Sequence, residues 1–201
     1  VGSEMCIRDR TKDDGTVAPC LAKSWKMSDD SLEYTFQLEE GVKFHNGEVM
    51  TADDVVYSYE QYIANPAKNN FVSMIDKVEM VDANTVKVTL NKVTPLFLVY
   101  INELPILNKK FVEEHNGNIS DVACGTGPYK LTSIDLATSA MLERNDDYRL
   151  APAAIEKVEL RYVGDRSTAS VQLETGDLDI MSIDPSQLVS FENNDKFTVE
   201  K

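Results

Sequence analysis

Histidines and paired acids are the residues of this sequence whose side chains could take part in catalysis. The two histidines, His45 and His115, lie far apart in the chain. A loop histidine is more often a hydrogen-bonded turn residue than a general base, because a base needs a correctly placed partner. Turns, a helix start or a solvent-facing helix explain the acid pairs, which are Asp29–Asp30, Asp53–Asp54, Glu113–Glu114 and Asp146–Asp147.

Motifs for the commoner kinds of catalytic and metal chemistry do not occur in the sequence. There is no Gly-x-Ser-x-Gly turn for a serine nucleophile, no His-Glu-x-x-His zinc helix and no Cys-x-x-Cys pair. The glycines of Gly125-Thr126-Gly127 could cradle an anion, but the Lys-Ser/Thr of a phosphate loop is missing. We therefore predict that the protein is not an enzyme and has no cofactor and no metal site.

The charge of the chain limits its partners. Among 201 residues there are 34 acidic and 20 basic ones, which gives a formal net charge of −14. Nucleic acids and anionic membrane surfaces attract clusters of Lys and Arg, so neither is expected as a partner. A well-solvated acidic surface is the simplest explanation of the charge. The content of 42% hydrophobic and 27% charged residues is ordinary for a globular protein.

The stretch from Trp25 to Ile63 contains the clearest local signals. Tyr34, Phe36 and Leu38 alternate with polar residues, which predicts a half-buried strand paired with a short strand at residues 25–27. Thr51 is followed three residues later by Asp54, an arrangement that predicts a capping box and a helix start. The helix is expected to bury Val55, Val56, Tyr59 and Ile63 and to end at Asn65–Pro66.

The remainder reads as a mixed run of strands and helices. Residues 78–90 predict a β-hairpin, and Gly176 is expected to end a helix. The predicted helices cover residues 95–101, 107–115, 165–174 and 185–191, and the predicted strands cover residues 129–134, 140–143, 155–163, 178–181 and 197–199.

Four groups of residues together resemble a known family. The first group is Pro19-x-Leu21-Ala22-x-Ser24-Trp25, Tyr34-Thr35-Phe36-x-Leu38, Gly41-Val42-Lys43-Phe44-His45-Asn46-Gly47 and Thr51-Ala52-Asp53-Asp54-Val55. The others are Gly125-Thr126-Gly127-Pro128-Tyr129, Arg144-Asn145-x-x-Tyr148 and Leu173-x-x-Gly176-Asp177-x-Asp179. In this order they resemble the extracellular solute-binding proteins of the peptide, nickel and oligopeptide class, which serve ABC importers. Glu39 departs from the family pattern, where a basic residue is usual.

The resemblance implies an α/β fold of the type II periplasmic-binding-protein kind. Residues 11–40 would form the first part of lobe I, residues 41–123 an inserted α/β subdomain, and residues 124–201 the continuation of a truncated lobe I. Residues 13–40 and 124–201 are expected to share one sheet. Members of the family are more than twice as long, so the second lobe is expected to be missing and residues 11–201 to bind oligopeptides weakly alone.

The resemblance also implies the function. Such proteins capture a small solute between two lobes, close around it and dock on a membrane permease. We expect a monomer that binds an oligopeptide or dipeptide in the periplasm or outside the cell, with or without a lipid anchor. Ligands are expected at the carboxyl ends of strands, which points to Met181 and Ser182. Phe97, Tyr100 and Gly127 are further candidates, although core packing explains the aromatics more simply and a structural turn explains Gly127.

Other functions remain open from the sequence. Within the family the ligand could equally be a nickel complex, haem, a sugar or an opine. A ligand-sensing domain of a transcription regulator is an alternative from another class, and a basic helix-turn-helix segment upstream would indicate it. An enzyme is the third alternative.

The N-terminal segment and the cysteines complete the sequence picture. Residues 1–10, VGSEMCIRDR, fit neither the family nor a targeting segment, and we interpret them as a non-native artefact that resembles translated sequencing-adapter DNA. The expected signal peptide is absent from this chain. Without Cys6, two cysteines remain, Cys20 and Cys124. They could form a disulfide, but two thiols that pack as small apolar side chains are the favoured interpretation.

Overall fold

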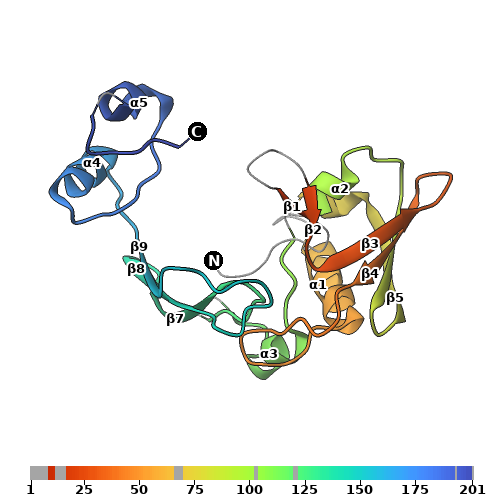
Figure 1. Ribbon diagram of the computed structural model, residues 1–201. Helices are drawn as coiled ribbons and strands as arrows, with labels where there is room; N and C mark the ends of the chain where they lie inside the picture. The colour runs from red at the N-terminus through yellow and green to blue at the C-terminus, as the bar shows by residue number, and fades with distance from the viewer. Residues whose placement is uncertain are drawn as a thin grey trace. The chain divides into compact units, whose positions relative to one another are not determined.

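The computed structural model describes residues 9–11, 17–65, 70–101, 104–119, 122–192 and 194–200. The chain forms two compact units, Val1–Leu160 and Arg161–Lys201 (Figure 1). No described helix is both long enough and apolar enough to cross a membrane.

The first unit is built on a four-stranded antiparallel sheet with the order β3-β4-β6-β5. Its strands are β3 (Ala22–Met27), β4 (Glu33–Leu38), β5 (Ile75–Asp82) and β6 (Thr85–Leu90). The register places Phe36 beside Val86, and both are fully buried on one face. On the other face Lys87 lies between Glu33 and Glu79, with ion-pair distances of 3.4 and 3.9 Å. The strict alternation in β4 therefore predicted correctly which face is buried.

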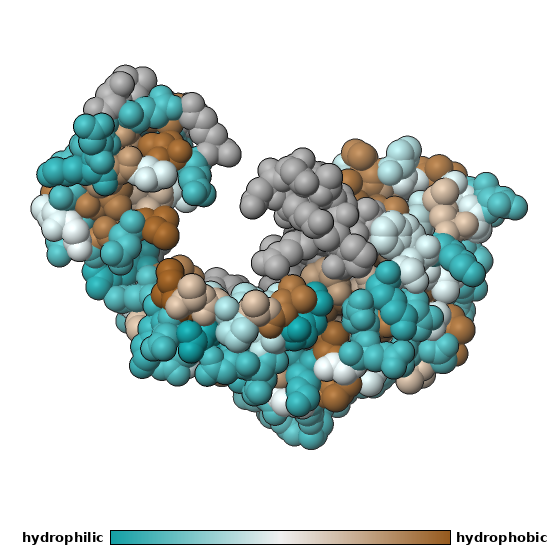
Figure 2. Space-filling view, in the orientation of Figure 1, coloured by the Kyte–Doolittle hydropathy of each residue, from teal (hydrophilic) through white to brown (hydrophobic). Residues whose placement is uncertain are grey.

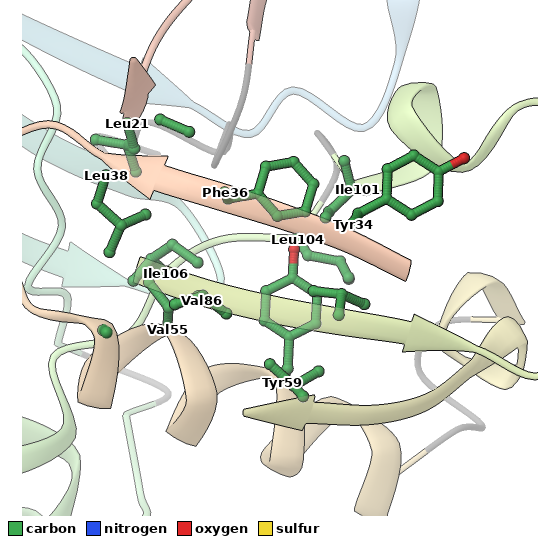
Figure 3. Close-up of a cluster of buried hydrophobic side chains, with 14 of the residues drawn as sticks. Leu21, Tyr34, Phe36, Leu38, Val55, Tyr59, Val86, Ile101, Leu104 and Ile106 are labelled. Atoms are coloured by element: carbon green, nitrogen blue, oxygen red, sulfur yellow. The ribbon is translucent and has the colours of Figure 1, made fainter. Parts of the chain in front are cut away.

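Helix α1 (Ala52–Ala64) packs against β5 and β6 and closes the core from the apolar side. Figure 3 shows Val55 and Tyr59 of α1 pointing at Phe36 and Val86 of the sheet. Thr51 is the N-cap of the helix and forms the predicted capping box, and Asn65 is its C-cap. The cluster is completed by apolar residues from the segment before β3, from the connection between β4 and α1 and from the chain after β6, among them Leu21, Val42, Met50, Ile101, Leu104 and Ile106.

The two edge strands of this sheet are irregular. Strand β3 has a register shift between Ala22 and Ser24, and β5 has shifts between Ile75 and Lys77 and between Met80 and Asp82. Such shifts are β-bulges or related irregularities, which bend a strand and leave part of its ladder unpaired. The inner strands β4 and β6 pair without a shift.

Short elements connect the sheet to the rest of the first unit. A 3₁₀ helix, η2 (Asn70–Met74), precedes β5, and two short helices, α2 (Phe97–Tyr100) and α3 (Lys109–Glu114), follow β6. Strands β1 (Asp9–Thr11) and β2 (Val17–Pro19) form an antiparallel pair. Both α2 and α3 lie where the sequence predicted helices, but each is shorter than expected.

A second, three-stranded sheet has the order β7-β8-β9. It contains β7 (Tyr129–Asp135), β8 (Ser139–Arg144) and β9 (Lys157–Arg161). The expectation that residues 13–40 and 124–201 share one sheet is wrong for the described strands, because β4 pairs with β6 of the predicted insertion. An alternating strand shows which of its faces is buried but not which strand lies beside it. The division into lobe and insertion remains a prediction.

The second unit contains α4 (Arg166–Thr175) and α5 (Pro185–Glu192). Asp165 caps α4 by accepting a hydrogen bond from the Thr168 amide at 2.8 Å. Gly176 ends the helix with φ +84°, as predicted. The predicted strand at residues 178–181 is wrong, because these residues are irregular and Ile180 is 82% exposed. The predicted strand at 197–199 is also irregular. Figure 2 shows apolar side chains on the surface of this unit.

Candidate functional site

A hollow in the second unit contains two of the predicted ligand-facing residues. It has a volume of about 760 Å³ and is lined by the segments 179–183 and 196–200 with Leu173 and Phe191. Met181 and Ser182 lie on the first segment, where Ser182 is exposed and Met181 is partly buried. These two consecutive residues therefore both line a concave site, although not at the end of a strand.

The hollow combines apolar walls with groups of opposite charge. Ile180, Met181, Ile183 and Phe191 supply apolar surface, and Phe191 is held by an edge-on contact with Phe197 at 5.3 Å between ring centres. Asp179 lies on one lining segment, and Lys196 and Glu200 lie on the other. Apolar walls with a few polar groups are typical of small-molecule sites. Sequence reasoning did not single out Asp179 or Lys196, and nothing in their local pattern marks them as ligand-facing.

Phe97, Tyr100 and Gly127 lie in the first unit and do not contribute to that hollow. Phe97 is 1% exposed and packs against Tyr34 with ring centres 4.7 Å apart. Tyr100 is partly buried against the same core. Core packing, the simpler interpretation of both aromatics, agrees with these positions. Gly127 is buried, and its carbonyl oxygen accepts hydrogen bonds from side chains rather than facing an open site.

Three of the sequence motifs meet at Gly125–Pro128. His45 of the Phe44–Gly47 turn donates its amide hydrogen to the Gly125 carbonyl at 2.8 Å. The His45 ring bonds to Gly125 N through Nδ1 at 3.2 Å and to Gly127 O through Nε2 at 3.0 Å. Asn145 donates from Nδ2 to Gly127 O at 3.1 Å. These motifs, separated in sequence, therefore form one structural joint.

The chemistry of His45 follows from these bonds. Burial lowers the pKa of His45, and the positive charge of Lys130 lowers it further, while the bond to Gly127 acts in the opposite direction. Both ring nitrogens are engaged by the main chain. The ring is thus a structural connector, which agrees with its interpretation as a turn residue.

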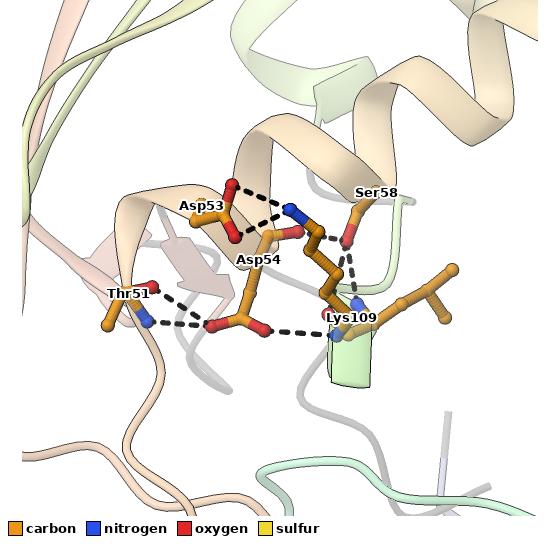
Figure 4. A network of polar contacts seen from close by, with 6 residues as sticks. Thr51, Asp53, Asp54, Ser58 and Lys109 are labelled. Atoms are coloured by element: carbon orange, nitrogen blue, oxygen red, sulfur yellow. Dashed lines mark hydrogen bonds and ion pairs between the residues drawn. The ribbon is translucent and has the colours of Figure 1, made fainter. Parts of the chain in front are cut away.

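A second hollow, of about 520 Å³, lies where α1 and α3 begin. Two of its acids, Asp53 and Asp54, are engaged by groups of the two helix starts (Figure 4). Asp54 is 8% exposed; its Oδ2 accepts from the Thr51 amide at 2.9 Å and its Oδ1 accepts from the Lys109 amide at 3.0 Å. Asp53 pairs with the Lys109 ammonium at 2.9 Å. Asp53 and Asp54 therefore link the starts of α1 and α3, which agrees with the interpretation of this acid pair as part of a helix start rather than as catalytic carboxylates.

Side chains that the sequence analysis did not select complete this network. The Ser58 hydroxyl donates to the Asp54 carbonyl at 2.6 Å and accepts from the Leu107 amide at 2.8 Å. Asn108 caps α3 through the Phe111 amide at 2.7 Å. An asparagine directly before an amphipathic stretch is a recognised cap signal, so Asn108 could have been found; Ser58 could not. Among the described residues no group of three His, Cys, Asp or Glu side chains could hold a metal ion.

The described cysteines are not joined by a disulfide. Cys20 is 3% exposed within the core, and Cys124 packs against that core from outside. Burial raises the pKa of the Cys124 thiol, which therefore stays uncharged near neutral pH. The positions of both residues agree with their interpretation as small packing side chains.

Comparison with known proteins decides the family. Residues 16–201 match the profile of the bacterial extracellular solute-binding proteins, family 5 (middle region). The chain belongs to this family. Membership confirms the resemblance inferred from the sequence motifs. The family comprises solute-binding proteins rather than enzymes, which supports the corresponding prediction at the level of the family.

Individual members of family 5 resemble the chain along most of its length. Heme-binding protein A of Haemophilus influenzae is 27% identical, over 82% of this chain and 35% of that protein. NikZ from Campylobacter jejuni, solved in complex with Ni(L-His), has a TM-score of 0.83 at 31% identity, over 97% of this chain and 40% of that one. The oligopeptide-binding protein AppA from Bacillus subtilis, solved in complex with a nonapeptide, has a TM-score of 0.78 at 26% identity, over 89% and 37%.

These family 5 relatives show the fold as well. The chain spans 35% to 40% of the length of the three proteins named. Its mixed α/β structure fits part of the first lobe of a type II periplasmic binding protein, which confirms the predicted fold class.

Proposed function

We propose that this chain is part of a solute-binding protein that captures an oligopeptide or dipeptide and delivers it to an ABC permease. The observation that carries the proposal is the match to the solute-binding family over residues 16–201. The proposal includes a location in the periplasm or outside the cell and action as a monomer. Capture would involve closure of two lobes around the solute.

The hollow of the second unit supports a peptide as the solute. A short peptide carries a positive amino end, a negative carboxyl end and side chains of varied polarity. Asp179 and Lys196 offer charges opposite to those two ends, and Met181 offers a flexible apolar surface. Met side chains adapt to different partners, which suits a site that must accept more than one peptide sequence. We therefore assign Met181 and Ser182 to the ligand side of this unit.

Isothermal titration with the whole protein that contains this chain tests the proposal. Peptides of two to nine residues, Ni²⁺ with histidine, and haem would be titrated in parallel. We expect saturable one-to-one binding of peptides. Binding of the nickel complex or haem with no response to any peptide would contradict the peptide assignment while leaving the family function intact.

Variants of two methionines test the position of the site. Met181→Gln removes apolar contact in the hollow at nearly constant volume, and we expect about tenfold weaker binding, equivalent to about 1.4 kcal/mol. Met27→Gln is the matched control, because Met27 is 53% exposed at the end of β3 and does not line the hollow. Equal affinities of the two variants would remove Met181 from the site.

A further inference from the structure

The His45 joint has a hydrogen-bond pattern that fits only one form of the imidazole. The Gly125 amide can only donate, so Nδ1 must carry a lone pair and accept. The Gly127 carbonyl can only accept, so Nε2 must carry a hydrogen and donate. The joint therefore requires a neutral ring in the Nε2–H form.

Protonation would oppose this arrangement at one atom. A second hydrogen on Nδ1 would point at the Gly125 N–H, replacing an attraction by a contact between two donors. The bond from Nε2 to Gly127 would remain, and so would the main-chain bond from His45 N to Gly125 O. Protonation is thus expected to weaken the joint from one side rather than to unfold the unit.

Among the charged groups near the ring, Lys130 also disfavours protonation of His45, and the others are neutral or already engaged by another group. Lys130, at the start of β7, contributes a positive charge that disfavours a charged imidazole. The Cys124 thiol beside the joint is neutral. Arg144 and Asp146, which flank Asn145, pair with each other at 2.7 Å. On the histidine's own loop, Glu48 is engaged by Lys110 and Asn108.

We propose that His45 is a pH-sensitive clasp between the Phe44–Gly47 turn and the Gly125–Pro128 turn. The clasp is closed while the ring is neutral. It loosens on acidification below about pH 6.5, the ordinary value for histidine, because the open form binds a proton that the closed form does not. The turn that carries Gly127 then gains freedom relative to the sheet that carries β4. This pH dependence of the clasp does not depend on which solute the protein binds.

Nuclear magnetic resonance on the full chain tests the clasp directly. Nitrogen-15 chemical shifts of the two ring nitrogens report the tautomer, and we expect His45 as the Nε2–H form at pH 7.5. Its titration gives the pKa in the closed clasp, expected below the ordinary value. An Nδ1–H tautomer, or a pKa at or above about 6.5, would overturn the proposal.

Amide hydrogen exchange supplies an independent measurement. The protection of the Gly125 amide, relative to the amides of β4 and β6, should fall between pH 7.5 and pH 5. The fall should be about tenfold for each pH unit by which the measured His45 pKa lies below its ordinary value. Protection that does not change with pH would contradict the clasp, because the titration and the exchange must agree.

A pair of glutamine variants separates the clasp from general acid sensitivity. His45→Gln carries an amide that can still donate to Gly127 but cannot be protonated, so the pH dependence at Gly125 should disappear. His115→Gln is the control, since the His115 ring bonds only locally to Phe111 O at 2.7 Å. A pH dependence that survives in His45→Gln would refute the proposal, and the wild-type titration decides the question if that variant does not fold.

Discussion

Replacement of Asp54 should show how much a buried, hydrogen-bonded carboxylate stabilises the fold, with the exposed carboxylate of Asp53 as the comparison. Its two oxygens accept the Thr51 amide, the Thr51 hydroxyl and the Lys109 amide, and its side chain fixes the start of α1 against the start of α3. The neighbouring Asp53 carries the same charge in the same helical turn but forms an ion pair whose side chains are 37% and 53% exposed. The two positions therefore form a matched pair.

The expected loss in the free energy of unfolding follows from the hydrogen-bonding groups that each substitution leaves without a partner. Asp54→Ala leaves the amides of Thr51 and Lys109 unpaired in a largely buried place, and each such donor costs about 1–3 kcal/mol. Loss of the helix cap is part of the same sum. We expect the free energy of unfolding to fall by about 3 kcal/mol. Asp53→Ala removes a solvent-screened ion pair and should cost less than about 1 kcal/mol.

Urea unfolding followed by tryptophan fluorescence measures both changes. Trp25 is the single tryptophan, and it lies in β3 against the core, so the signal reports the unit that contains Asp54. With a urea dependence of about 2 kcal/mol per molar, Asp54→Ala should lower the midpoint by about 1.5 M and Asp53→Ala by less than about 0.5 M. Similar midpoints for the two variants would refute the claim that the Asp54 bonds stabilise the fold.

Two further predictions concern a backbone position and pH. Gly176→Ala should destabilise α4 by about 1 kcal/mol, because φ at this position is +84°. Gly164→Ala is the control, because an added Cβ there meets only ordinary contacts at 3.8 Å. Circular dichroism melts compare the two variants, and equal losses of stability would contradict the argument. The free energy of unfolding should fall as pH decreases from about 6.5 toward the lowered pKa of His45, since the unfolded chain binds that proton first. Urea titrations at pH 7 and 5.5 should show this fall in the wild type and a smaller one in His45→Gln.

Local signals in the sequence predicted the first unit well. The capping box of Thr51 and Asp54, the alternation of Tyr34, Phe36 and Leu38, and the hairpin around residues 78–90 all depend on neighbours within a few residues. Such patterns follow from the periods of helix and strand and from local hydrogen bonds. Each of these elements is found in the structure where the sequence predicted it.

Features that depend on distant neighbours were less predictable. The pairing of β4 with β3 was predicted correctly, but its second neighbour is β6 rather than a strand from residues 124–201. Residues 178–181 have an apolar pattern typical of a buried strand, but no described strand pairs with them and Ile180 is exposed. The meeting of His45, Gly127 and Asn145 could not be derived from spacing, although each motif was recognised separately.

The candidate site was predictable only in part. Met181 and Ser182 were selected by the rule that ligands bind beyond strand ends, and they line the hollow although the strand is absent. Asp179 and Lys196 come from two segments that only the fold brings to one place. Their charges point to a binding site only once the structure shows that both residues line the same hollow.

The irregular edges of the four-stranded sheet have a consequence for the behaviour of the protein at high concentration. A straight, regular edge strand presents open hydrogen-bonding groups on which a strand of another molecule can add, and this is a route to aggregation. The register shifts in β3 and β5 interrupt that template on both sides, and Lys23, Lys26 and Lys77 place charges along the same edges. A strand of a second copy that added to either edge would have to leave backbone groups unpaired at these shifts. We therefore expect the irregular edges to disfavour strand pairing between molecules at high concentration.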